Sequence, residues 1–177
     1  MKILFILFLI ALMFTGCSEN GTSMSQGEWR IQGVSQKGPF ITGSTVNIME
    51  LDKKMLQTGK MFKLTIKSDK GDFILEGDAS YSKYAIIEVN GYYRNEITGK
   101  KSSSPLTLRA ITDISHREKV NVNLLTHLEY ERVMYLVSNG KSVMDAKAQA
   151  RKEIISAMAM NESDGAFEDL DIFQSGD

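Results

Sequence analysis

The side chains that most often catalyse reactions or bind metals are scarce in this chain. It has one cysteine and two histidines among 177 residues, which excludes an internal disulfide and a four-cysteine zinc site. His127 and Glu131 would face each other on a helix, so their spacing is compatible with a metal site or a proton-transfer site. We favour a simpler interpretation, in which His127 bonds to a carboxylate or to backbone beside the core. We therefore assign no catalytic residue, no metal and no cofactor.

Two other polar segments lack the spacing of a reactive site. Ser102-Ser103-Ser104 has no flanking glycines of a nucleophile elbow, so we interpret it as a loop. The oxygen-rich stretch Asn161–Asp169 could hold a calcium ion loosely, but we favour an unliganded tail. The chain has 21 basic and 22 acidic residues, without the basic excess of a nucleic-acid-binding surface. Nucleic acid is therefore not an expected partner.

The best candidate ligand contacts are aromatic. Tyr92, Tyr93 and Arg94 stand where a strand is expected to end, and Trp29 lies elsewhere in the same β region. Sugars are commonly bound by aromatic faces flanked by planar hydrogen-bonding groups, and a loop on a rigid scaffold is a suitable place for recognition. The alternative, which we favour, is that the tyrosines are packing residues. Polysaccharide binding through these four residues remains an alternative function.

The single cysteine lies directly behind a leader-like segment. Twelve apolar residues, Ile3–Phe14, follow Lys2, which is the order of a secretory signal and is too short for the ~20 residues of a spanning helix. The motif Phe14-Thr15-Gly16-Cys17 resembles the lipobox of bacterial lipoproteins. The resemblance implies cleavage between Gly16 and Cys17 and acylation of Cys17. The alternative is an ordinary signal peptide that happens to have a cysteine near its cleavage site.

The expected mature product is a lipid-anchored chain. Residues 1–16 would be the signal peptide, and residues 17–27, rich in Ser, Gly, Thr and Asn, would be an acylated tether. Several acyl chains, with ~0.8 kcal/mol for each buried methylene, would hold Cys17 stably in the lipid bilayer. Ser18 follows the cysteine in place of Asp, which by resemblance to enteric sorting favours the outer membrane. We therefore expect an exported protein of the outer membrane or cell surface.

Residues 28–115 are expected to form a β-sandwich. Apolar and polar residues alternate with the period of a strand in several short runs, and one run is nearly continuously apolar, as in a strand buried on both faces. Ser68–Asp72 supplies turn residues between two alternating runs, so we predict a β-hairpin there. Many short strands with turns between them favour a sandwich. The expected strands are centred on Val46–Ile48, Phe62–Ile66, Phe73–Leu75, Tyr84–Val89 and Leu106–Ala110.

Residues 116–160 are expected to form a helical hairpin. Asn123 can cap a first helix that ends at Ser138, and Ser142 can cap a second. The second helix has an apolar stripe on one side and cations, including Lys147, on the other. This stripe must be buried against the sandwich or against a partner. Its members are Val143, Ala146, Ala150, Ile154 and Ala157.

Residues 161–177 form an acidic tail. The segment has six acidic residues and no lysine or arginine, yet it also contains large apolar residues such as Phe167 and Leu170. Such a tail either docks onto the cationic body or begins an element whose remainder is missing. Both alternatives remain open from the sequence.

Residues 33–92 resemble a carboxypeptidase-regulatory-like, or transthyretin-like, β-sandwich. Such domains have a Gly-Ser-x-Val strand start, a Thr-Gly pair, an Asp-x-Gly-x-Phe turn and a closing Gly-Tyr. The resemblance implies a mainly β fold, a transthyretin-like sandwich followed by an αα-hairpin. The corresponding segments are Gly43-Ser44-Thr45-Val46, Thr58-Gly59, Asp69-Lys70-Gly71-Asp72-Phe73 and Gly91-Tyr92.

A second resemblance covers nearly the whole mature chain. Gln36–Phe40, Asn90–Glu96 and Val120–Glu129 are similar to the N-terminal region of uncharacterised surface lipoproteins from fibre-degrading and gut bacteria. The resemblance implies a location and an architecture but little chemistry. Because the sequence pairs a sandwich and an anchor with no acid/base or nucleophile constellation, we expect a noncatalytic surface module, structural or interacting, with an extracellular protein or polysaccharide as its partner. The resemblance also implies that the chain can be a truncated piece of a larger surface lipoprotein. A polysaccharide-binding module and a truncated fragment are thus the two alternatives.

Overall fold

The computed structural model describes residues 29–77, 82–161 and 165–171, and they form a mainly β structure with two α-helices. The predicted class, mainly β with an α-helical addition, is confirmed at this level. The expected signal peptide 1–16 and tether 17–27, with Gly16 and Cys17, lie outside the described residues. The elements are β1 (Trp29–Gln36), β2 (Thr45–Leu51), β3 (Gln57–Thr65), β4 (Asp72–Gly77), β5 (Tyr84–Gly91), β6 (Leu106–Asp113), β7 (Val122–Asn123), α1 (Leu124–Ser138), α2 (Val143–Ala157) and the 3-10 helix η1 (Phe167–Asp169).

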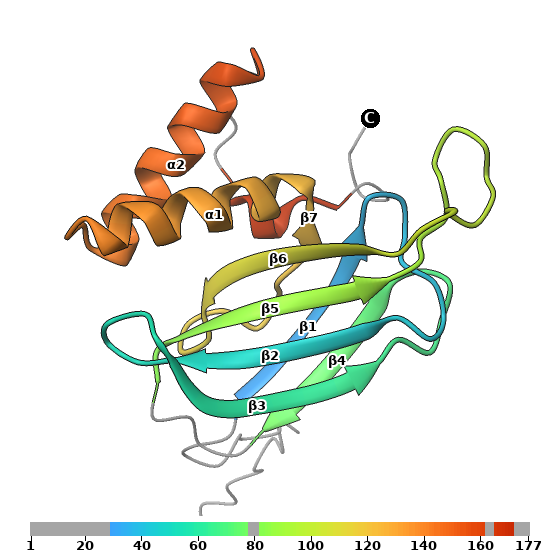
Figure 1. Cartoon of the computed structure of the whole chain (residues 1–177), viewed down its shortest axis with the longest axis horizontal. Helices are drawn as coiled ribbons and strands as arrows, with labels where there is room; N and C mark the ends of the chain where they lie inside the picture. Colours follow the sequence, from blue (N-terminus) through green and yellow to red (C-terminus); the bar gives the residue numbers. More distant parts are fainter. Residues whose placement is uncertain (1–28, 78–81, 162–164, 172–177) are drawn as a thin grey trace, which may run out of the picture.

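The strands form two sheets that share one apolar core. The three-stranded sheet has the order β4-β1-β7 and the four-stranded sheet the order β3-β2-β5-β6. In Figure 1, β1 and β4 cross behind the four-stranded sheet. Alternating residues of both sheets point into the space between them, as expected for packed sheets. The core includes Ile31, Phe40, Val46, Ile48, Phe73, Ile87, Val89, Leu108, Ala110, Val120 and Val122.

The predicted hairpin around Ser68–Asp72 is wrong. Its two strands exist, but β3 pairs with β2, whereas β4 pairs with β1 in the other sheet. The connection therefore carries the chain from one sheet to the other, and Phe62 and Phe73 reach the same core from opposite sides. A period of two determines which side chains face inward, but it does not determine which strand is the neighbour. Gly71 has φ of +77°, and a Cβ there would lie 2.5 Å from the carbonyl oxygen of Ser35.

β5 is buried on both faces, as its continuous apolar sequence predicts. Ala85 and Ile87 face the core between the sheets, whereas Ile86 faces the helices. The strand lies between β2 and β6 in the four-stranded sheet. The last strand, β7, lies within residues 116–160, for which the sequence predicted only a helical hairpin. It pairs in parallel with the end of β1.

Both helices begin where their caps predict. Asn123 accepts a hydrogen bond from the Thr126 amide at the start of α1, and the Ser142 hydroxyl accepts one from Asp145 at the start of α2. α1 lies along β6, and α2 rises from the end of α1 (Figure 1). A second core fills the space between the helices and the outer face of the four-stranded sheet. It consists of Leu51, Met55, Ile86, Ile111, Val133, Leu136, Ala146 and Ala150.

α2 differs from expectation in two respects. Of the predicted α2 stripe, Ala146 and Ala150 are buried, but Ile155 rather than Ile154 continues it. Lys147 is not on a solvent-facing side, because its ammonium group bonds inward. The polar and apolar sides of α2 are therefore less sharply divided than its sequence indicates.

Candidate functional site

The four candidate aromatic and arginine contacts do not form one surface. Trp29 is buried at the start of β1, where its ring packs edge-on against Phe62 with a centroid distance of 4.9 Å. Tyr93 lies beyond the other end of β1, where it bridges to Phe40 and packs 6.2 Å from the ring of that residue. An exposed aromatic platform that combines Trp29 with the tyrosines is therefore not present.

Tyr92 and Arg94 are exposed but already have contacts within the chain. The Lys101 ammonium lies 3.8 Å from the ring centroid of Tyr92. The Arg94 guanidinium donates to the Gly99 carbonyl at 2.9 Å and pairs with Asp69 at 3.6 Å. One ring face of Tyr92 is thus close to a cation, where a stacked sugar would otherwise lie.

His127 and Glu131 do not form the metal or proton-transfer site that their spacing allows. Glu131 pairs with Arg109 at 3.8 Å. The Nδ1 atom of His127 is buried and has no hydrogen-bond partner among the described residues, so the expected bond to a carboxylate or to backbone is also absent at this atom. Burial, together with the charge of Arg109, lowers the pKa of His127, while Glu131 acts in the opposite direction. These conditions favour the neutral imidazole.

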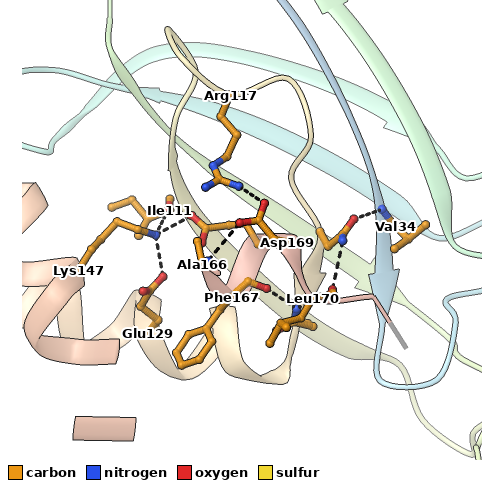
Figure 2. Close-up of polar contacts among 12 residues, drawn as sticks. Val34, Ile111, Arg117, Glu129, Lys147, Ala166, Phe167, Asp169 and Leu170 are labelled. Carbon is orange, nitrogen blue, oxygen red and sulfur yellow. Dashed lines mark hydrogen bonds and ion pairs between the residues drawn. The ribbon is translucent and has the colours of Figure 1, made fainter. Parts of the chain in front are cut away.

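A buried charge cluster that the sequence did not predict joins four elements. The Lys147 ammonium donates to Glu129 at 2.7 Å, to Glu168 at 2.6 Å and to the Ile111 carbonyl at 2.9 Å. The two carboxylate side chains are each 2% exposed and the lysine side chain 23%. Figure 2 shows Lys147 pointing from α2 toward Glu129 and the Ile111 carbonyl. The cluster therefore connects α2, α1, β6 and η1.

The cluster contains two carboxylates and one ammonium, so its charges are unequal. Burial, as the largest cause, raises the pKa of Glu129, and the nearby Glu168 adds to the rise while Lys147 opposes it. The Oε2 atom of Glu168 is buried and has no hydrogen-bond partner within the described part of the chain. One signal in the sequence could have revealed this cluster. Glu129 stands four residues before Val133, within the buried side of α1, where a carboxylate needs a partner.

The described part of the acidic tail, residues 165–171, docks onto the body, so the first of the two tail alternatives holds for this part. The Asn121 side chain donates to the Leu170 carbonyl at 3.1 Å, and the Asn123 side chain donates to the Phe167 carbonyl at 2.9 Å. Arg117 pairs with Asp169, as Figure 2 shows. Ile172 and Phe173 lie outside the described residues.

A pocket of about 650 Å³ lies where four distant parts of the chain meet. The end of β1 and the following turn form one wall, the first turn of α1 a second, and the docked C-terminal segment a third. Glu96 adds a contribution from the segment between β5 and β6. Pockets of this size are typical of ligand sites. The lining consists of Gln36, Lys37, Gly38, Glu96, Asn123, Leu124, Leu125, Asp169, Leu170 and Asp171.

The pocket adjoins the predicted tyrosine–arginine segment without including it. Lys37 pairs with Glu96 at 3.2 Å, and its ammonium lies 5.2 Å from the ring centroid of Tyr93. Gly38, with φ of +34°, approaches so closely that a Cβ would lie 2.0 Å from the Arg94 carbonyl oxygen. Tyr93 and Arg94 thus support one wall of the pocket from behind.

The fold and the pocket define a two-sheet β protein with a helix pair and a docked C-terminal segment. Among residues 29–77, 82–161 and 165–171, no group of three or more His, Cys, Asp or Glu side chains is arranged to hold a metal ion. No helix in that part of the chain has the length and hydropathy needed to cross a membrane. Comparisons with protein-family models, with curated proteins and with solved structures found no match.

Proposed function

We propose that the chain is a membrane-anchored bacterial surface lipoprotein whose folded part is a noncatalytic interaction module. The observation that carries the proposal is the position of the only cysteine, Cys17, directly after an apolar leader and Gly16. Acylation there would attach the protein to the bilayer through several lipid chains. The expected location is the outer membrane or the cell surface.

The folded part is suited to presentation at a surface. The first described strand begins at Trp29, twelve residues after Cys17, which leaves room for a short polar tether. We also propose that the two sheets belong to the transthyretin-like type, which the motifs between Gly43 and Tyr92 support. The buried cluster of Lys147, Glu129 and Glu168 supports a structural role for these three charges, because it connects η1 to both helices.

The anchor is tested by replacing Cys17 with serine in cells fed an alkyne-bearing palmitate. The unchanged protein should be labelled and should enter the detergent phase. The Cys17→Ser variant should lose the label and, once its leader is removed, should leave the membrane fraction. Ser18→Ala serves as the matched control, because it keeps the cysteine and should remain labelled.

Two results would contradict the anchor. Label on the Cys17→Ser variant would place the acyl chain elsewhere, and a leaderless variant that stays in membranes would show another means of attachment. A screen of the purified chain against polysaccharides, with Tyr92→Ala as control, distinguishes the sugar-binding alternative. Binding that is lost in this variant would favour that alternative over a protein partner.

A further inference from the structure

We propose that the pocket between β1, α1 and the C-terminal segment binds a basic amphipathic segment of a partner protein. Apolar side chains of that segment would lie against α1, and its lysine or arginine side chains would face the acidic rim. This inference rests on the proposed interaction function and names the chemistry of the partner.

The apolar wall of the pocket is accessible. Leu124 is 44% exposed and Leu170 is 36% exposed, although both are large apolar residues that line the same cavity. Leu124 also occupies the first position of α1, where polar and acidic residues are favoured by the helix end. Leucines gathered in a hollow and left open to solvent are typical of interaction sites.

The apolar surface continues beyond the pocket along α1. Leu128 is 48% exposed and Tyr135 is 59% exposed. Positions 124, 128 and 135 lie on one face of the helix, since their spacings of four and seven residues match whole turns. From Leu124 to Tyr135 this face is about 16 Å long at 1.5 Å per residue. Such a length fits an extended or helical peptide segment better than a small molecule.

The charges around the pocket favour a cationic partner. The lining includes three carboxylates, from Glu96, Asp169 and Asp171, and one ammonium, from Lys37. Arg117 pairs with Asp169 from outside the lining, so the carboxylates outnumber these cations by one. Complementary charge guides the approach of a partner and discriminates against acidic ones.

The walls of the pocket are held in place before any partner arrives. The Gln36 side chain donates to Asp171 at 2.8 Å, which joins the end of β1 to the C-terminal segment. Asp169 is held by Arg117, and Leu124 directly follows Asn123, the residue that caps α1. A preformed surface loses little conformational entropy on binding.

The test uses the mature chain through Asp177 with Cys17→Ser, which carries no acyl chain. The probe is a fluorescein-labelled 18-residue helical peptide of leucine and lysine, and its matched control has glutamate at every lysine position. Fluorescence anisotropy should show binding of the lysine peptide that weakens with added salt. Leu124→Gln should weaken it about tenfold, and Glu96→Gln should reduce its salt dependence. Met144→Gln, at an exposed site on α2 outside the pocket, should leave the affinity unchanged.

Several outcomes would overturn the proposal. Equal binding of the glutamate peptide would remove the charge argument, and undiminished binding by Leu124→Gln would place the peptide elsewhere. Circular dichroism distinguishes a lost site from a lost fold, and a misfolded Leu124→Gln variant is replaced by Leu170→Gln. Dimers that dissociate in these variants would identify a second copy as the occupant. The acylation experiment is independent, so failure of the pocket and failure of the anchor give different results.

Discussion

Two buried glutamates of the described structure share one lysine. Glu129 and Glu168 both contact the Lys147 ammonium, and each is almost fully buried. A buried carboxylate is costly unless its charge is compensated or removed by protonation. The raised pKa of Glu129 is the expected response to this arrangement.

The Glu129 carboxyl should make stability depend on pH. Its pKa in the folded state lies above the ordinary glutamic acid value of 4.5, so the folded state holds this proton more tightly than the unfolded state. The contribution of this group is fully present below pH 4.5 and is lost as the pH rises through the folded pKa. Relative to the unchanged protein, Glu129→Gln should therefore become more stable as the pH increases across this window.

Urea unfolding of both proteins at several pH values measures this effect. The difference in free energy of unfolding, variant minus unchanged protein, should grow with pH above 4.5. Glu153→Gln is a useful contrast, because the Arg132 and Gln149 side chains hold the pKa of the half-buried Glu153 at about 2. A difference for Glu129→Gln that stays constant or shrinks with pH would contradict the pKa direction.

Among the elements, the start of α1 has more than one role. The Asn123 side-chain oxygen caps the helix by accepting from the Thr126 amide at 2.9 Å. Its side-chain nitrogen donates to the Phe167 carbonyl in η1 at 2.9 Å. Asn123 also ends β7, so one residue connects the three-stranded sheet, a helix and the C-terminal segment.

Asn123→Ala should lower stability more than the corresponding change at the other helix. Loss of a cap costs ~1 kcal/mol, and loss of the second hydrogen bond, to the Phe167 carbonyl, adds about 1 kcal/mol more. Ser142→Ala, which removes only the exposed cap of α2, should cost ~1 kcal/mol. Hydrogen exchange at residues 165–171 should accelerate in Asn123→Ala and stay unchanged in Ser142→Ala. Equal exchange in both variants would show that the second bond does not hold η1.

The sequence predicts these helices well because helix caps are local. Asn123 and Ser142 stand immediately before their helices, and each bonds to an amide three residues later. Strand positions are also predictable from alternation, as in β2, β5 and β6. Strand partners are not, because β3 and β4 satisfy the same local pattern whether they pair together or in separate sheets.

The pocket is less predictable than the elements that form it. Gly38, Leu124 and Leu170 come from distant parts of the chain and become neighbours only after the sheets, the helix and the tail have docked. Two of the predicted ligand contacts, Tyr93 and Arg94, lie next to the pocket, behind one of its walls. Trp29 was expected in the same group, but its large apolar surface is buried beside Phe62.

At the scale of the whole molecule, Lys147 connects the four-stranded sheet, both helices and the C-terminal segment. Its ammonium reaches β6 through the Ile111 carbonyl, α1 through Glu129 and η1 through Glu168. These contacts cross the boundary between the outer face of the four-stranded sheet, the helices and the docked segment (Figure 2). Removal of the lysine therefore affects the arrangement of several elements at once.

Lys147→Met should cost about 3–5 kcal/mol, because it removes the ammonium that both buried carboxylates contact. Lys152→Met, at an exposed position of the same helix, should change the free energy of unfolding by less than ~0.5 kcal/mol. Addition of Glu129→Gln and Glu168→Gln to Lys147→Met should recover part of the loss. Chemical denaturation measures all four proteins, and equal losses for the two single lysine variants would refute the role of the buried cluster.

The position of β1 between early and late partners has a consequence for folding during synthesis or export. One edge of β1 pairs with β4, which ends at Gly77, but its other edge is covered by residues 118–123. A chain that emerges N-terminus first keeps this second edge open until most of its length is available. Contacts so distant in sequence form slowly. β1 therefore completes its pairing late, and until then its open edge is the part that a chaperone would need to protect from aggregation.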